Sequence, residues 1–368
     1  MFSVTSLGFL PFMALFVCLW YCVPQPSRWK LVLAANAVFC LSIDIGAFFA
    51  VALATAVVWQ AAQHAQPEQP SRRGWLALGL AAALLPLLVL KYSGMLVPGL
   101  RDLYKPFGLA YYSLQLAGYL LDVWHGRTAP TPSYARLWCY AGFFLSLTQG
   151  PFNRYNTLMP QLEAAPKTFE TQRLVSGLQR SAWGYFKKFA IADRAAIVVS
   201  AAFADPAYFD RSQLIFATVM YSFQLYADFS GYTDIVLGMG EILGLHLPEN
   251  FRQPFFSASV KELWARWHMS LSQWFRDYVY IPVGGDRMGI ARRDANLLLT
   301  FLVSGLWHGA NWTFLVWGGL HGLCQVAEDH MPAPLRKRKS LPLRIVGVPL
   351  TFAIFVTTFT IFRASSLG

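Results

Sequence analysis

One histidine stands in the middle of a strongly apolar stretch. His308 lies in the segment LWHGANW, within the apolar residues 297–327. If this stretch enters a membrane, an ionisable side chain there is costly and indicates a functional site. Histidine suits general-base chemistry, because its ordinary pKa is about 6.5 and burial favours the neutral form that accepts a proton. The alternative is a structural imidazole that is hydrogen-bonded to a neighbouring carbonyl.

Two further histidines could take part. His321 follows His308 by thirteen residues, which on a continuous helix turns it about 140° away, so we expect a structural role for it. His268 lies in the segment RWHMSLSQWFRDY. On a helix it follows Trp264 by one turn, where it either faces the mouth of a cavity or packs against its neighbours.

The residues around His268 predict one amphipathic helix over 261–278. Apolar side chains recur there every three or four positions, as in an interfacial helix with an aromatic anchor. They are Trp264, Trp267, Leu271, Trp274 and Tyr278. On such a helix Lys261, Gln273 and Arg276 extend away from the apolar face.

Three acidic residues, Asp228, Asp234 and Glu241, interrupt another apolar segment. Paired carboxylates could serve a glycosidase, but nothing here supplies a soluble sugar cleft. We therefore interpret them as ion-pair partners or as helix caps near Ser230–Gly231. The sequence has no GxxxxGK(S/T), HExxH, GxSxG or paired CxxC motif, so ATPase, metalloprotease and hydrolase activities and a metal site lack support.

The composition places these residues in a membrane protein. Only 13% of the 368 residues are charged and 55% are hydrophobic, whereas soluble domains carry about 25% charged residues. The net charge of +11 comes from Lys and Arg in short segments between apolar runs, which is the positive-inside pattern and not a nucleic-acid-binding surface. The five cysteines lie mostly inside apolar runs and are interpreted as packing residues. The class is a polytopic membrane protein.

The apolar runs predict the elements that position the histidines. We expect a first span over Leu7–Val23 with the N-terminus outside, two short spans over 31–62 that break at 42–46, and another over 75–97. Later runs contain Gly, Pro and ionisable residues. They predict broken or re-entrant helices that line a cavity.

The stretch around His308 predicts a dip into the membrane and back. As one helix, residues 297–327 would be about 46 Å long against a hydrocarbon core of about 30 Å. Basic residues on both flanks, Arg292–Arg293 and Arg336–Lys339, are expected in the cytoplasm. We expect the chain to bend at glycines within this stretch. These are Gly305, Gly309, Gly318, Gly319 and Gly322.

Several ordered segments resemble the membrane-bound O-acyltransferases, and within them the bacterial alginate O-acetylation membrane proteins. The segments include PFGLAYYSLQ at 106–115, KKFAIADR at 187–194, DFSGYTD at 228–234, PENFRQPF from Pro248, RWHMSLSQWFRDYVYIPVGG at 266–285 and GLWHGANWTFLVWGGLHG at 305–322. The resemblance implies an all-α bundle with a central funnel and broken helices. It implies a single membrane domain over 1–368, with N-terminal spans at 1–99, a family core at 100–327, and a basic loop and last span at 328–368.

The resemblance also implies the site. His308 maps onto the catalytic histidine of the family and His268 onto a second one that orients or relays. Asn311 and Ser304, each one turn from His308 if helical, are expected to stabilise the oxyanion or bind substrate together with Trp307. Arg266, Arg276 and Lys261 are expected to meet CoA phosphates. No bound cofactor or metal is implied, because acetyl-CoA is the acyl donor and therefore a substrate.

The implied function is transfer of acetyl groups from a cytosolic donor towards a cell-envelope polysaccharide such as alginate, in the bacterial inner membrane and with extracytoplasmic partner proteins. Two alternatives stay open: D-alanyl transfer to teichoic acid, and a non-catalytic transporter or scaffold. Members of this branch usually continue with further spans, so we expect either a naturally short member or a truncated form.

Overall fold

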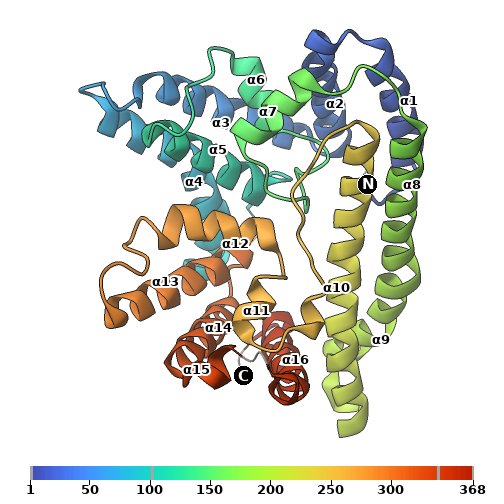
Figure 1. Cartoon of the computed structure of the whole chain (residues 1–368), viewed down its shortest axis with the longest axis vertical. Coiled ribbons are helices and arrows are strands. Elements are labelled where there is room, and N and C mark those ends of the chain that lie inside the picture. Colours follow the sequence, from blue (N-terminus) through green and yellow to red (C-terminus); the bar gives the residue numbers. More distant parts are fainter. Residues whose placement is uncertain (1–2, 101–102, 338–339, 367–368) are drawn as a thin grey trace. The chain divides into compact units, whose positions relative to one another are not determined.

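The computed structural model describes residues 3–100, 103–337 and 340–366, and every regular element within them is helical (Figure 1). The predicted all-α class is confirmed. The helices are α1 (Phe9–Cys22), α2 (Arg28–Ile43), α3 (Ile45–His64), α4 (Arg72–Leu96), α5 (Leu109–Trp124), α6 (Tyr134–Ala141), α7 (Tyr155–Ala164), α8 (Thr171–Phe186), α9 (Asp193–Ala204), α10 (Arg211–Ile242), α11 (Val260–Trp264), α12 (Met269–Phe275), α13 (Ile290–His308), α14 (Trp312–His330), α15 (Ala333–Lys337) and α16 (Leu341–Arg363). Two residues of the predicted basic anchor, Arg338 and Lys339, lie outside the described residues.

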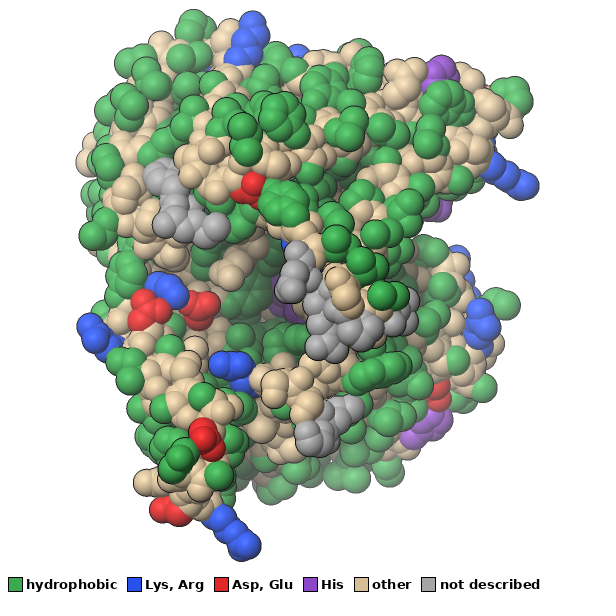
Figure 2. Space-filling model, turned by 180° about the vertical axis from the view of Figure 1, so that it is seen from behind, with side chains coloured by type: hydrophobic (Ala, Val, Ile, Leu, Met, Phe, Trp, Pro, Cys, Tyr) green, Lys and Arg blue, Asp and Glu red, His purple; other side chains and the backbone are tan. Residues whose placement is uncertain are grey.

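Among the described residues, three helices are long and apolar enough to cross a membrane: α3, α4 over Arg72–Met95, and α16, with mean hydropathies of 1.9, 1.9 and 2.1. They expose large apolar side chains, such as Leu53 on α3 and Ile345 on α16, and Figure 2 shows apolar side chains over much of one face. The predicted first span corresponds to α1, which has 14 residues and is shorter than the about 20 residues that a full crossing needs.

The chain divides into two compact units. The first comprises Met1–Tyr185 and Tyr232–Pro248. Its α2 and α3 are separated at Asp44, inside the predicted break at 42–46, and the Asp44 carboxylate accepts the Gly46 N–H at 2.9 Å as an N-cap. In the same unit Arg180 on α8 pairs with Asp234 at 3.1 Å.

The second unit comprises Phe186–Gly231 and Glu249–Gly368 and contains all three histidines of interest. Its buried apolar cluster draws residues from α9, α10, α11, α14 and α16 and includes Trp267. Lys188 pairs with Asp228 at 2.6 Å. The interpretation of the acidic residues as ion-pair partners is therefore confirmed for Asp228 and Asp234, whereas α10 runs through Ser230–Gly231 without a cap.

The predicted continuous helix over 261–278 is wrong. The structure has two short helices, α11 and α12, followed by a π-helical turn at Arg276–Tyr280. Helix α11 ends at Trp264, and His268 stands before α12 with φ 44° and ψ 51°, in the left-handed region. His268 is therefore not one helical turn beyond Trp264, and the apolar stripe is divided between two helices.

The predicted dip around His308 is a helical hairpin. Helices α13 and α14 are joined by the three residues Gly309–Asn311, so of the predicted bends only Gly309 lies at the turn. Gly305 and Gly318 lie inside the helices, where they let the two backbones approach. A Cβ on Gly305 would lie 2.3 Å from the Phe314 carbonyl oxygen, and one on Gly318 would lie 2.3 Å from that of Phe301.

Candidate active site

His308 is the last residue of α13 and lies directly before the turn of the hairpin. Its half-buried imidazole is surrounded by aromatic rings from three helices. The ring centroids lie 4.9 Å from Trp307, 5.2 Å from Trp317 on α14 and 5.2 Å from Phe362 on α16. The hairpin and α16 together therefore position this histidine.

His268 also lies at this aromatic cluster, although it precedes His308 by forty residues in the sequence. Only 2% of its surface is exposed, and its ring lies edge-on to Phe229 with centroids 4.6 Å apart. Trp307 contacts both imidazoles, since its centroid is also 6.2 Å from that of His268. Burial lowers the pKa of His268 well below its ordinary value, and the nearby His308 lowers this pKa further. His268 is thus neutral at physiological pH.

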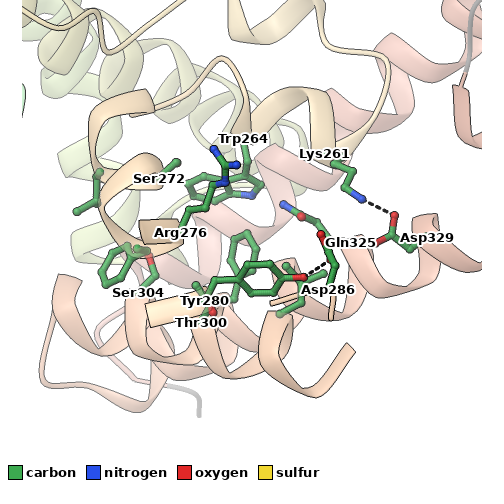
Figure 3. Close-up of a pocket in the computed structure, with 14 residues that line it drawn as sticks. Lys261, Trp264, Ser272, Arg276, Tyr280, Asp286, Thr300, Ser304, Gln325 and Asp329 are labelled. Atoms are coloured by element: carbon green, nitrogen blue, oxygen red, sulfur yellow. Dashed lines mark hydrogen bonds and ion pairs between the residues drawn. The ribbon is translucent and has the colours of Figure 1, made fainter. Parts of the chain in front are cut away.

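A pocket of about 280 Å³ lies beside α13 in this unit (Figure 3). Its lining combines an aromatic floor with polar and charged groups from α11, α12, the π-helical turn, the turns between Tyr280 and α13, and α13 and α14 themselves. They are Lys261, Trp264, Leu271, Ser272, Phe275, Arg276, Tyr280, Asp286, Leu297, Thr300, Phe301, Ser304, Gln325 and Asp329.

The lining residues of α13 form one stripe that continues to His308. Leu297, Phe301 and Ser304 line the pocket, and His308 follows Ser304 by one turn, as predicted for a helix. His308 comes eleven positions after Leu297, which turns it only about 20° from that face. The pocket and His308 therefore share one face of α13.

The predicted basic residues separate into two groups. Lys261 and Arg276 line the pocket, whereas Arg266 does not and pairs with Glu262 at 2.6 Å. Lys261 is itself paired with Asp329, as Figure 3 shows. Within the described residues no ion pair or hydrogen bond of the Arg276 guanidinium is found, so Arg276 is the lining cation without a direct partner, although Asp286 lines the same pocket.

Asn311 is not placed as predicted. It lies in the turn, outside α13, and is therefore not one helical turn from His308. Its Oδ1 accepts the Thr313 N–H at 3.2 Å and caps α14, while its Nδ2 donates to the Ser365 carbonyl at 2.8 Å. Both ends of the amide are thus occupied in holding the hairpin.

His321 has the surroundings of a structural histidine. It is fully buried, and its Nδ1 accepts the indole N–H of Trp264 at 3.2 Å. Its Nε2 lies 3.0 Å from the Thr358 hydroxyl. Because Nδ1 accepts, Nε2 carries the proton and donates to Thr358, which in turn donates to the Ile354 carbonyl at 2.8 Å. A neutral imidazole thus joins α11, α14 and α16.

Replacing Thr358 by valine is expected to destabilise the protein by about 1–3 kcal/mol, because it leaves the Nε2–H of His321 buried without its acceptor. Thermal unfolding of the purified protein measures the change. Thr357→Val is the matched control, since Thr357 is exposed and bonds only to Ala353 in its own helix. Equal stability of the two variants would contradict the structural role of His321.

Sequence periodicity missed the aromatic residues that surround His308. Trp317 and Phe362 come from helices 9 and 54 residues further along the chain, and no local pattern indicates that they meet one imidazole. Among the described residues no group of three His, Cys, Asp or Glu side chains could hold a metal ion.

Comparison with known proteins identifies the family to which this helical site belongs. The sequence model of the membrane-bound O-acyltransferase family matches residues 87–366. The chain therefore belongs to the membrane-bound O-acyltransferase family. It is accordingly a membrane protein and an O-acyltransferase, which confirms the resemblance of its ordered segments.

Its curated relatives carry three kinds of activity. The chain is 34% identical over 375 residues to the probable alginate O-acetylase AlgI of Azotobacter vinelandii, covering 97% of this chain and 74% of the relative. It is 30% identical to the peptidoglycan O-acetyltransferase of Helicobacter pylori, covering 83% and 64%. The teichoic acid D-alanyltransferase of Bacillus subtilis is more distant, at 27% identity with 85% and 84% covered.

Proposed function

We propose that the protein transfers acetyl groups from acetyl-CoA for the O-acetylation of a cell-envelope or secreted polysaccharide such as alginate. Several relatives at 33–35% identity are described as probable alginate O-acetylases. The single observation that carries the proposed site is the common face of α13, on which pocket-lining residues lead to His308.

The donor enters at the N-terminal end of α13. A second pocket of about 510 Å³ shares Lys261, Asp286 and Asp329 with the first and adds Arg293, so the two adjoin there. This is the end that we predict to face the cytoplasm. Phosphates of the donor bind Arg276 and Lys261 by charge-assisted hydrogen bonds, and the thioester arm extends over the aromatic floor towards His308.

His308 acts as the general base. It takes the proton of the acceptor hydroxyl as that oxygen attacks the thioester carbonyl carbon. The Ser304 hydroxyl donates to the developing oxyanion. When the carbon–sulfur bond breaks, the His308 imidazolium returns the proton to the leaving thiolate, and the products are an acetyl ester and the CoA thiol. Neutral His268 orients the reacting groups, and Trp307 excludes water.

The setting is a multi-pass protein of the bacterial inner membrane. The three candidate spans α3, α4 and α16 support this setting, and the donor is cytosolic whereas the polysaccharide lies outside. We propose that an extracytoplasmic partner protein completes the transfer, with its own hydroxyl accepting the acetyl group first.

Release of CoA from radiolabelled acetyl-CoA tests the proposal. Purified protein in detergent is expected to release the CoA thiol and to transfer the label. We expect both events only when an acceptor, either alginate oligomers or the partner protein, is present. The same preparation is offered a D-alanyl thioester of a carrier protein. Consumption of that thioester and not of acetyl-CoA would assign the chain to D-alanyl transfer, and consumption of neither would contradict the proposed reaction.

Replacing Arg276 by alanine is expected to raise the KM for acetyl-CoA by about 10- to 100-fold with little change in kcat, because a charge-assisted hydrogen bond of about 1.5–3 kcal/mol is lost. Initial rates over a range of donor concentrations measure the effect. Arg292→Ala is the control, since Arg292 is exposed and lines neither pocket. An equal KM for acetyl-CoA in both variants would contradict binding of the donor in this pocket.

A further inference from the structure

His268 has an unusual backbone for a residue with a side chain. Its φ of 44° is positive, and among the described non-glycine residues only Gln253 shares this property. The left-handed region crowds the Cβ atom of an L-amino acid against its own backbone, so such a residue needs surrounding contacts to hold it there. The contacts that hold His268 come from the segment around Asn250.

Asn250 is fully buried and bonds to the first turn of α12. Its main-chain carbonyl accepts the Met269 N–H at 3.0 Å. Its side-chain Oδ1 accepts both the Ser270 N–H at 3.3 Å and the Ser270 hydroxyl at 2.6 Å. The first N–H groups of a helix have no partner within that helix, and Asn250 supplies partners for two of them.

Because of these bonds from Asn250, the side chain of His268 does not need to cap α12. His268 is the N-cap residue of α12, yet its side chain makes no capping hydrogen bond. Ser, Thr, Asp and Asn are preferred at the N-cap because their side chains can satisfy these N–H groups themselves. Because Asn250 caps α12 from another segment, a histidine can stand at the N-cap and place its ring against Phe229 and Trp307.

A second main-chain hydrogen bond holds the residues that precede His268. The Arg252 N–H donates to the Arg266 carbonyl at 2.9 Å. Together with the bond from Met269 to Asn250, this main-chain bond brackets the residues before and after the imidazole. The segment from Asn250 to Arg252 therefore holds both ends of the turn that carries His268.

We infer that Asn250, acting through Ser270, is a positioning residue that holds the His268 imidazole beside Trp307 and His308. The expected effect on acyl transfer rests on the proposed function. The expected effect on the position of the His268 ring does not. Asn250 acts on the reaction only through His268, and it does not touch the reacting groups.

Chemical labelling tests the position of the ring without reference to activity. Diethyl pyrocarbonate modifies accessible neutral imidazoles, and mass spectrometry of the full-length protein in detergent identifies the modified histidines. We expect His268 to be protected in the wild type and in the exposed control Asn156→Ala, and to be modified at least about tenfold faster in Asn250→Ala. His321 should stay protected in every variant, because its own partners are untouched. Continued protection of His268, or joint exposure of His268 and His321, would overturn the inference.

A double-mutant cycle tests the link to catalysis. Asn250→Ala should lower the acyl-transfer rate by about tenfold or more, since a small misplacement of a reacting group has a large effect. The variant that combines Asn250→Ala with His268→Ala should be no slower than His268→Ala alone. Losses that multiply would contradict action through His268. A His268→Ala variant with the full wild-type rate would contradict the proposed role of His268, and the labelling result would then decide the positioning by itself.

Discussion

The variant His308→Ala is expected to lose acyl transfer by about 10²- to 10⁴-fold, which is the usual contribution of general acid–base catalysis. The variant should still insert in the membrane, purify normally and bind the donor, because the proposed phosphate contacts, Arg276 and Lys261, lie in the pocket and His308 is not among its lining residues. Acetylation of the polysaccharide in cells and CoA release in detergent measure the loss. His308→Gln fills similar space and can form hydrogen bonds, but it cannot take a proton, so it should be equally inactive.

Two further substitutions sharpen this expectation. His246→Ala is the matched control, since His246 is exposed and its side chain makes no hydrogen bond within the described residues. His268→Ala should retain a reduced rate, because His268 orients and does not take the proton. Unchanged acetylation in His308→Ala would show that His308 is not the general base. A greater loss of activity in His268→Ala than in His308→Ala would indicate that His268 is the base and His308 the orienting residue.

Gly318→Ala is expected to have the second large effect. The added Cβ would lie 2.3 Å from the main-chain oxygen of Phe301, so α13 and α14 must separate. Overpacking of this kind destabilises by about 1–3 kcal/mol or more. The same movement shifts His308 at the end of α13, and a displacement of about 1 Å can reduce the rate by about 10²-fold. Thermal unfolding and acyl transfer should therefore both be impaired.

The next residue supplies the control. A Cβ on Gly319 meets only Leu302 at 3.7 Å, an ordinary contact. Alanine is about 0.5–1 kcal/mol better than glycine inside a helix, so Gly319→Ala should be neutral or slightly stabilising, with normal activity. Equal destabilisation by the two substitutions would show that the close approach of the backbones at Gly318 does not hold the hairpin together.

Much of the fold could be predicted from local patterns. The break between α2 and α3 at Asp44 was visible as a polar interruption of an apolar run, and the hairpin around His308 followed from its length and its basic flanks. Ion pairs at Asp228 and Asp234 were expected because carboxylates within an apolar segment need partners. Each of these features depends on residues close together in the sequence or on a general requirement for compensation.

Other features depended on distant residues and were missed. The spacing over 261–278 fits a helix, yet the backbone enters the left-handed region at His268, and the next residue, Met269, bonds to the distant Asn250. Gly305 and Gly318 were expected to bend the chain, whereas they let two backbones approach. Asn311 was expected on the helix of His308, and it instead caps the next helix and binds the chain near its end.

The amino-acid sequence by itself determined the class of protein, many of the helical segments and the histidines that could take part in chemistry, because composition, apolar periodicity and motif order can be read along the chain. The resemblance implied that His268 and His308 act together, but only the tertiary structure showed which aromatic residues bring the two imidazoles to one place. Trp307 contacts both His268 and His308, while His321 is held by hydrogen bonds from α11 and α16. Such contacts arise from packing between helices that are distant in sequence. The spacing of residues along one helix therefore does not predict them.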